Sequence, residues 1–162
     1  KTAWGTGLSC HSCLLRPKSR GEVTLESADP FADPLIDPKF LSHPDDMKDM
    51  VDGYKAMMKV MSSEHFSKYI SEDTQRPVDI NDDADIEQAM RELADTVYHP
   101  VGTCKMGDDD MSVVDSNLKV HKIKGLRVVD ASIMPTLVGG NTNAPTIMIG
   151  EKASDLILDE WA

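Results

Sequence analysis

The 162-residue sequence is poor in cysteine and in basic side chains, and it contains no long apolar run. Three cysteines are too few and too odd in number for a disulfide framework, which favours a reducing compartment. With 17 basic and 28 acidic residues, the net charge of -11 argues against nucleic-acid binding and against electrostatic docking on anionic lipid. No apolar run approaches the roughly 18 to 20 residues that span a bilayer. We expect a cytoplasmic protein, with peripheral association at the inner membrane left open.

The cysteines do not add up to a metal site. Cys10 and Cys13 have the C-x2-C spacing of half a zinc site, but Cys104, His11 and the distant histidines supply no second spaced pair. The acidic run at 108–110 lacks the ligand alternation and glycine of a calcium loop. We therefore predict no metal.

Hydrophobic periodicity predicts an α+β chain. Between residues 44 and 62 the apolar side chains, many of them Met, recur every three or four positions, as on one face of a core-packed helix. Three prolines within 30–38 predict extended surface chain. A second helix is expected at 65–70. A third is expected after a cap at Asn81 or Asp82, with an apolar inner face of Ile86, Met90, Leu93 and Val97, and the last is expected at 144–160. Strands are expected at 8–16, 21–26, 113–115, 118–121 and 125–130.

Two loops carry the residues that point to chemistry. The first is Tyr98-His-Pro-Val-Gly-Thr-Cys-Lys-Met-Gly107, which directly follows the helix expected after the cap at Asn81 or Asp82. In it His99 is followed by Pro100 and Gly102, which fix or permit unusual backbone geometry. Histidine exchanges protons readily near neutral pH, so it suits acid–base catalysis. A single histidine is more often structural, and the interpretation depends on the second loop.

The second loop is Gly139-Gly-Asn-Thr-Asn-Ala-Pro-Thr146, which leads into the last expected helix. Helix N-termini carry unpaired N–H donors and partial positive charge, so they favour electron-rich groups. Paired glycines allow a flat ligand to approach the backbone closely. Asn141 or Asn143 could instead simply cap the helix, and this segment alone does not decide between the two interpretations.

The segments 98–107 and 125–149, with 14–30 upstream, resemble the C-terminal region of the glucose–methanol–choline (GMC) flavoprotein oxidoreductases, most closely the bacterial FAD-dependent alcohol and choline dehydrogenases. The resemblance covers nearly the whole chain. It implies an antiparallel sheet with packed helices from the substrate domain, plus a closing strand and helix of the FAD domain. Residues 1–97 are then expected to be part of the substrate-binding domain. Residues 98–162 are expected to hold the active-site loop and the C-terminal strand and helix of the FAD-binding domain.

The resemblance also implies roles for individual residues. His99 is expected to take the substrate hydroxyl proton beside the flavin, and Asn141 to face the same hydroxyl. Five further residues are expected to bind FAD. Asp130 and Ala131 are expected at its diphosphate and ribityl region, and Asn143, Pro145 and Thr146 along the flavin ring. The implied activity is oxidation of a primary alcohol, with electrons passing to a quinone-type acceptor.

The sequence departs from the family pattern at one important point. It has no G-x-G-x-x-G motif, which holds the FAD diphosphate, and it does not begin with Met. We therefore expect the C-terminal portion of an enzyme, dependent on an N-terminal FAD domain and binding FAD weakly when alone. Two alternatives stay open, besides the weaker one of a small metal protein that uses Cys10, Cys13 and His11. One is choline oxidation, although aromatics for a cationic cage make up only 5% of the chain. The other is a non-catalytic domain that self-associates through its exposed interface.

Overall fold

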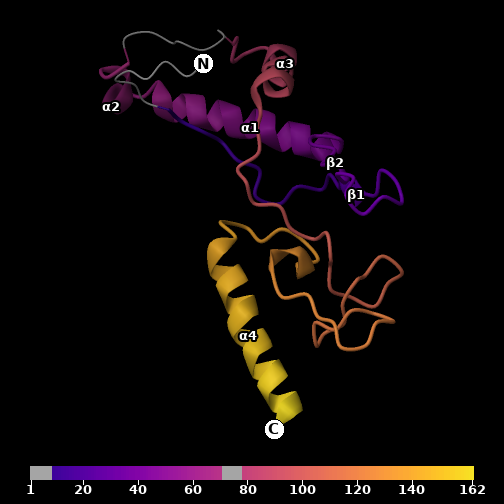
Figure 1. Ribbon diagram of the computed structural model, residues 1–162. Coiled ribbons are helices and arrows are strands. Elements are labelled where there is room, and N and C mark those ends of the chain that lie inside the picture. The colour runs from indigo at the N-terminus through magenta and orange to yellow at the C-terminus, as the bar shows by residue number, and fades with distance from the viewer. Residues whose placement is uncertain (1–8, 71–77) are drawn as a thin grey trace. The chain divides into compact units, whose positions relative to one another are not determined.

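The structure, a computed structural model, describes residues 9–70 and 78–162 and forms two compact units (Figure 1). The first unit comprises Lys1–Leu14 and Leu41–Thr96, and the second comprises Leu15–Phe40 and Val97–Ala162. Helices and a short antiparallel sheet together confirm the predicted α+β class. None of the helices in the described ranges has the length and apolar character needed to cross a bilayer.

The first unit is helical, with α1 (Pro44–Met61), α2 (Glu64–Ser67) and α3 (Asp83–Leu93). The predicted 44–62 helix is confirmed by α1, whose N-terminus is set by Pro44 in the first turn and by the His43 ring, which accepts from the Asp45 N–H. Helix α2 covers only part of the predicted 65–70 segment. Apolar side chains of α1 and α3 form the core of this unit: Met47, Val51, Ile86, Ala89 and Met90.

Helix α3 confirms one of the two predicted caps, because the Asp82 side chain accepts from the Ala84 N–H at 2.9 Å. The predicted inner face is only half right. Ile86 and Met90 are buried, but Leu93 and Val97 are about half exposed. The reason is that the backbone becomes extended at Ala94, so Val97 lies beyond the helix and loses the helical spacing.

The second unit begins with a two-stranded antiparallel sheet of β1 (Glu22–Thr24) and β2 (Leu35–Asp37). β1 lies inside the predicted 21–26 strand. The strand predicted at 8–16 is wrong for residues 9–16, and Leu8 lies outside the described residues. β1 pairs instead with the proline-rich segment, where Pro34 and Pro38 flank β2 and leave its three N–H groups intact. Both strands are exposed, as expected for surface chain.

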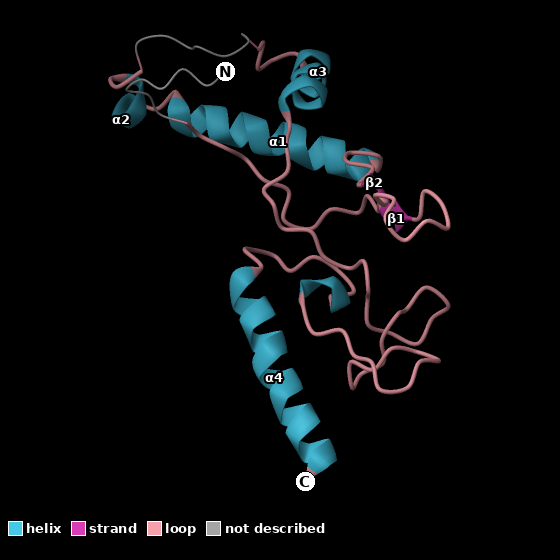
Figure 2. Ribbon diagram, viewed as in Figure 1, coloured by secondary structure: helices cyan, strands magenta, loops and turns pink. Residues whose placement is uncertain are grey.

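Most of the second unit between Val97 and Asn143 is loop (Figure 2). The strands predicted at 113–115, 118–121 and 125–130 are present only as isolated bridges, because positive φ angles at Leu118, Lys122 and Gly125 reverse the chain too often for a ladder. A short 3-10 helix, η1 (Ala131–Ile133), and the long α4 (Asn143–Trp161) complete the unit. Helix α4 confirms the predicted C-terminal helix. The core of the unit consists of Val114, Leu118, Ile133, Met134, Ile149 and Ala153.

Replacing Ile86 with alanine is expected to destabilise the first unit by about 2–5 kcal/mol, because it removes a fully buried side chain and leaves a cavity between α1 and α3. Leu93→Ala on the same helix is the matched control, since Leu93 is 50% exposed. Urea unfolding followed by far-ultraviolet circular dichroism measures both variants. Equal losses of stability in the two variants would contradict the described core.

Candidate active site

The loop that carries His99 is fixed to η1 by backbone hydrogen bonds. The Cys104 N–H donates to the Ser132 carbonyl at 3.0 Å, and the Met106 N–H donates to the Ile133 carbonyl at 2.8 Å. A tight turn closes the loop, with the Lys105 N–H 3.2 Å from the Gly102 carbonyl. The loop is therefore held against the core of the second unit rather than hanging free in solvent.

The backbone on both sides of His99 is in an unusual conformation. Tyr98 has a φ of 61°, and Gly102 has a φ of 87°. The left-handed region suits glycine but costs a residue such as tyrosine about 1–3 kcal/mol, and such strain clusters at functional sites. The sharp turn beside His99 therefore has a local conformational free-energy cost.

The two loops meet at the His99 ring. The Asn141 side-chain nitrogen Nδ2 lies 3.4 Å from His99 Nε2, so the structure places the two predicted catalytic residues side by side. The other ring nitrogen, Nδ1, lies 3.0 Å from the Thr142 hydroxyl. His99 is half-buried, Asn141 is exposed and Thr142 is buried. The Nε2 side of the ring is thus open to a ligand, while the other ring nitrogen, Nδ1, lies against the buried Thr142 hydroxyl.

Thr142 was not among the residues predicted from the sequence. The signal available was a threonine directly before a predicted helix, a position where hydroxyl side chains usually cap the backbone. Thr142 does stand at the N-cap of α4, so neither Asn141 nor Asn143 caps the helix. Its hydroxyl, however, makes no capping hydrogen bond. Its carbonyl accepts from the Thr146 N–H at 3.0 Å and from the Thr146 hydroxyl at 2.7 Å, which fixes the start of the helix.

The glycine pair before Asn141 has two different environments. A Cβ on Gly139 would lie 2.9 Å from a guanidinium nitrogen of Arg16, so the arginine packs against the backbone there. Among the described residues, and apart from the two chain neighbours, no heavy atom lies within 4 Å of the corresponding point on Gly140. The backbone before Asn141 is therefore covered by Arg16 at Gly139 and open at Gly140.

The predicted cofactor residues lie at the starts of η1 and α4, two elements that pack against each other. The exposed Asp130 carboxylate accepts from the Ser132 N–H at 2.7 Å and caps η1, and half-buried Ala131 begins that helix. Asn143 is exposed, and Pro145 and Thr146 are half-buried in the first turn of α4. Because α4 has no side-chain cap, its N-terminus keeps its affinity for an electron-rich group.

No group of three or more His, Cys, Asp or Glu side chains in residues 9–70 and 78–162 is arranged to hold a metal ion. Cys10 and Cys13 are free, exposed thiols, and half-buried Cys104 is also free.

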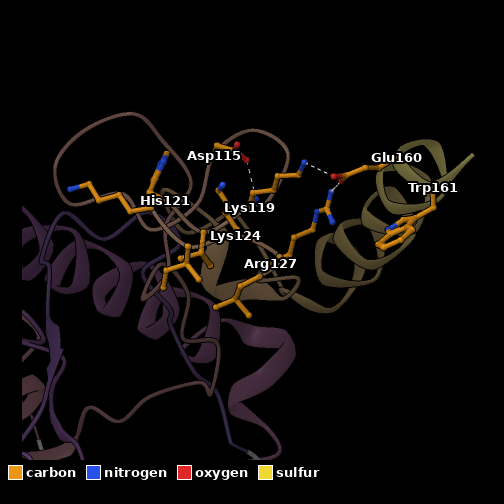
Figure 3. A pocket seen from close by; sticks show the side chains of 12 residues that line it. Asp115, Lys119, His121, Lys124, Arg127, Glu160 and Trp161 are labelled. Carbon is orange, nitrogen blue, oxygen red and sulfur yellow. Dashed lines mark hydrogen bonds and ion pairs between the residues drawn. The ribbon is translucent and has the colours of Figure 1, made fainter.

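A pocket of about 510 Å³ lies away from these loops, between the 119–127 segment and the end of α4 (Figure 3). Its lining includes neither His99 nor Asn141. Glu160 bonds both Lys119, at 2.8 Å, and Arg127. These hydrogen bonds, first from Lys119 and then from Arg127, hold the pKa of the Glu160 carboxyl below its usual value, so it is charged at neutral pH. Lys119 and Arg127 are therefore neutralised within the protein, and we regard this side of the pocket as an ion-paired surface.

Comparison with known proteins supports the family resemblance that the two loops indicated. A family model described as GMC oxidoreductase matches residues 17–150. The alcohol dehydrogenase [acceptor] of Pseudomonas putida is 48% identical over 158 residues, which are 98% of this chain and 29% of that protein. The oxygen-dependent choline dehydrogenase of Klebsiella pneumoniae is 44% identical over 151 residues, 93% of this chain and 27% of that protein.

Solved structures of related proteins also match this chain. A formate oxidase variant from Aspergillus oryzae, studied for its FAD modification, superposes with a TM-score of 0.85 at 35% identity. The match covers 91% of this chain and 26% of that one. The chain thus spans less than a third of the length of each of these relatives.

Replacing Gly102 with alanine is expected to destabilise the second unit by about 1–2 kcal/mol, because alanine resists the left-handed backbone and its Cβ would lie 3.2 Å from the Met134 carbonyl oxygen. Gly140→Ala in the other loop is the matched control, since nothing lies within 4 Å of its Cβ position. Chemical unfolding of both variants measures the difference. A larger loss at Gly140 than at Gly102 would show that the loop is not held as described.

Proposed function

The chain belongs to the GMC oxidoreductase family, and from this premise we propose that it is the C-terminal part of an FAD-dependent dehydrogenase that oxidises primary alcohols. The observation that carries the proposal is the pairing of His99 Nε2 with the Asn141 amide at 3.4 Å, at the open side of a half-buried ring. A base and a hydrogen-bond donor side by side are what removal of an alcohol proton requires.

In this proposal His99 Nε2 accepts the hydroxyl proton of the substrate as the O–H bond weakens. A positioned base of this kind contributes about 10²–10⁴ in rate. The imidazolium that forms and the Asn141 amide N–H then stabilise the negative charge that develops on the substrate oxygen. FAD, when bound, supplies the acceptor for the hydride that leaves the carbon.

The residues around the site fit a flavin. Gly140 leaves open space beside the catalytic pair, and the uncapped N-terminus of α4 offers positive potential to an electron-rich ring edge. We propose that Asn143, Pro145 and Thr146 line the ring and that Asp130 and Ala131 meet the diphosphate and ribityl region. In the same proposal residues 98–162 belong to the FAD-binding domain and residues 1–97 to the substrate-binding domain.

The surface of α4 supports a further partner, the N-terminal FAD domain. Ile149 and Ala153 are buried in the unit, yet Ile147, Met148 and Leu158 on the same helix are 57–67% exposed. Large apolar side chains that stay exposed on a helix already packed on one side indicate a surface that meets a partner, even with charged residues between them. We propose that the FAD domain covers this second face.

The name of the Pseudomonas putida relative refers to an unspecified electron acceptor, and we propose a quinone-type carrier. Choline is the alternative substrate, because the Klebsiella pneumoniae relative is named a choline dehydrogenase. Comparing kcat/KM for choline with kcat/KM for primary alcohols on the complete enzyme separates the two.

Replacing His99 with alanine in the complete enzyme is expected to lower kcat by about 10²–10⁴, because the proton acceptor is lost, while the flavin absorbance stays unchanged. His65→Ala is the matched control, since His65 is exposed on α2 in the other unit. Steady-state turnover and the flavin spectrum are measured on the same samples. Turnover near that of the wild type in the His99 variant would refute the assignment.

The chain alone is expected to bind FAD weakly, because its sequence lacks the G-x-G-x-x-G motif that holds the diphosphate. Ultraviolet–visible absorbance after incubation with FAD and desalting measures this. A stoichiometric flavin spectrum would show that the motif is dispensable. Light scattering on the same sample tests the non-catalytic alternative, in which the chain self-associates through its exposed apolar side chains, of which Phe31 is 93% exposed.

A further inference from the structure

The hydroxyl of Thr142 is used in an unexpected way. Threonine is favoured at helix N-caps because its side-chain oxygen accepts a hydrogen bond from the first turn. At the start of α4 that bond is not made, although Thr142 occupies the N-cap. The hydroxyl lies instead 3.0 Å from His99 Nδ1, on a residue 43 positions earlier in the chain. The capping group of the helix is therefore directed to the imidazole.

The contacts of the ring define where its proton sits. The Asn141 side-chain nitrogen has only hydrogens to offer, so the ring nitrogen that faces it, Nε2, is the acceptor in that contact. A neutral imidazole then carries its hydrogen on the other nitrogen, Nδ1. The group within hydrogen-bonding distance of Nδ1 is the Thr142 hydroxyl, whose oxygen can accept it.

The position of the hydroxyl is itself well fixed. Thr142 is buried, with 9% of its surface exposed. Its carbonyl is held by both the N–H and the hydroxyl of Thr146. A buried acceptor on an anchored backbone can orient a ring that is only half-buried.

We propose that Thr142 is a positioning residue that holds His99 in the tautomer protonated on Nδ1, so that Nε2, which faces Asn141, carries no proton and can take the one from the substrate. This rests on the proposed function for its catalytic consequence, whereas the tautomer itself does not. In the step, the alcohol O–H bond breaks, an Nε2–H bond forms, and the Nδ1–H continues to donate to Thr142. No proton passes to Thr142.

The tautomer is tested on the chain itself with nitrogen-15-labelled histidine. Two-dimensional spectra are recorded at a pH high enough that the ring shifts have stopped changing, and His99→Gln identifies the signals among those of the five histidines. We expect a protonated Nδ1 and an unprotonated Nε2 in the wild type and in Thr142→Ser, and a mixture of tautomers in Thr142→Val. A proton on Nε2 in the wild type, or a spectrum that Thr142→Val leaves unchanged, would overturn the proposal.

The consequence is tested by kinetics on the complete enzyme. Thr142→Val is expected to lower kcat by about 10- to 100-fold with little change in KM, because a misoriented base reacts slowly. Thr142→Ser, which keeps the hydroxyl, should restore most of the rate, and exposed Thr136→Val should leave it unchanged. Equal losses in the serine and valine variants would overturn the proposal. A fully active His99→Ala would refute the proposed function alone, because the tautomer measurement does not depend on turnover.

Discussion

The contact of the His99 ring with Asn141 and Thr142, directly before α4, is the constraint on which the candidate site in the second unit depends. It joins two loops that are about 40 residues apart in sequence, and neither loop forms the site alone. The apolar core beneath it makes the contact durable. Ile133 and Met134 from the η1 segment pack with Ile149 and Ala153 from α4, while the Cys104 N–H bonds the η1 backbone. The His99 loop, η1 and α4 therefore form one packed assembly.

This arrangement explains why strained backbone is tolerated beside His99. A left-handed tyrosine at position 98 would relax if its flanking chain were free. On its C-terminal side the loop is bonded to the carbonyls of Ser132 and Ile133. The strain is therefore held by the burial of the core, and the stability of that core is a condition for the geometry of the site.

The sequence predicted the parts of this structure that follow from local periodicity, and it failed where tertiary contacts decide. The helices at 44–61 and 143–161 carry regular apolar spacing and were found almost to the residue. The strands expected at 113–130 were not, because apolar residues in a loop that reverses repeatedly can fill a core without forming a ladder. The two catalytic candidates were identified by motif resemblance. Thr142 was not identified, because a threonine at the start of a helix is typical of a cap. Only the folded chain shows that its hydroxyl lies beside the imidazole.

The diversion of that one hydroxyl has two effects that favour the same chemistry. Pointing at Nδ1, it orients the imidazole so that Nε2 faces the open side of the site. By leaving the first turn of α4 without a side-chain cap, it also keeps the positive end of the helix available to an electron-rich ligand. A capping Thr142 would weaken both effects at once, because its oxygen would satisfy one of the helix N–H donors and leave the ring nitrogen Nδ1 without this partner. In the proposed function, the base and the cofactor-facing helix terminus are therefore coupled through the Thr142 side chain, and loss of its hydroxyl would first affect the orientation of the base.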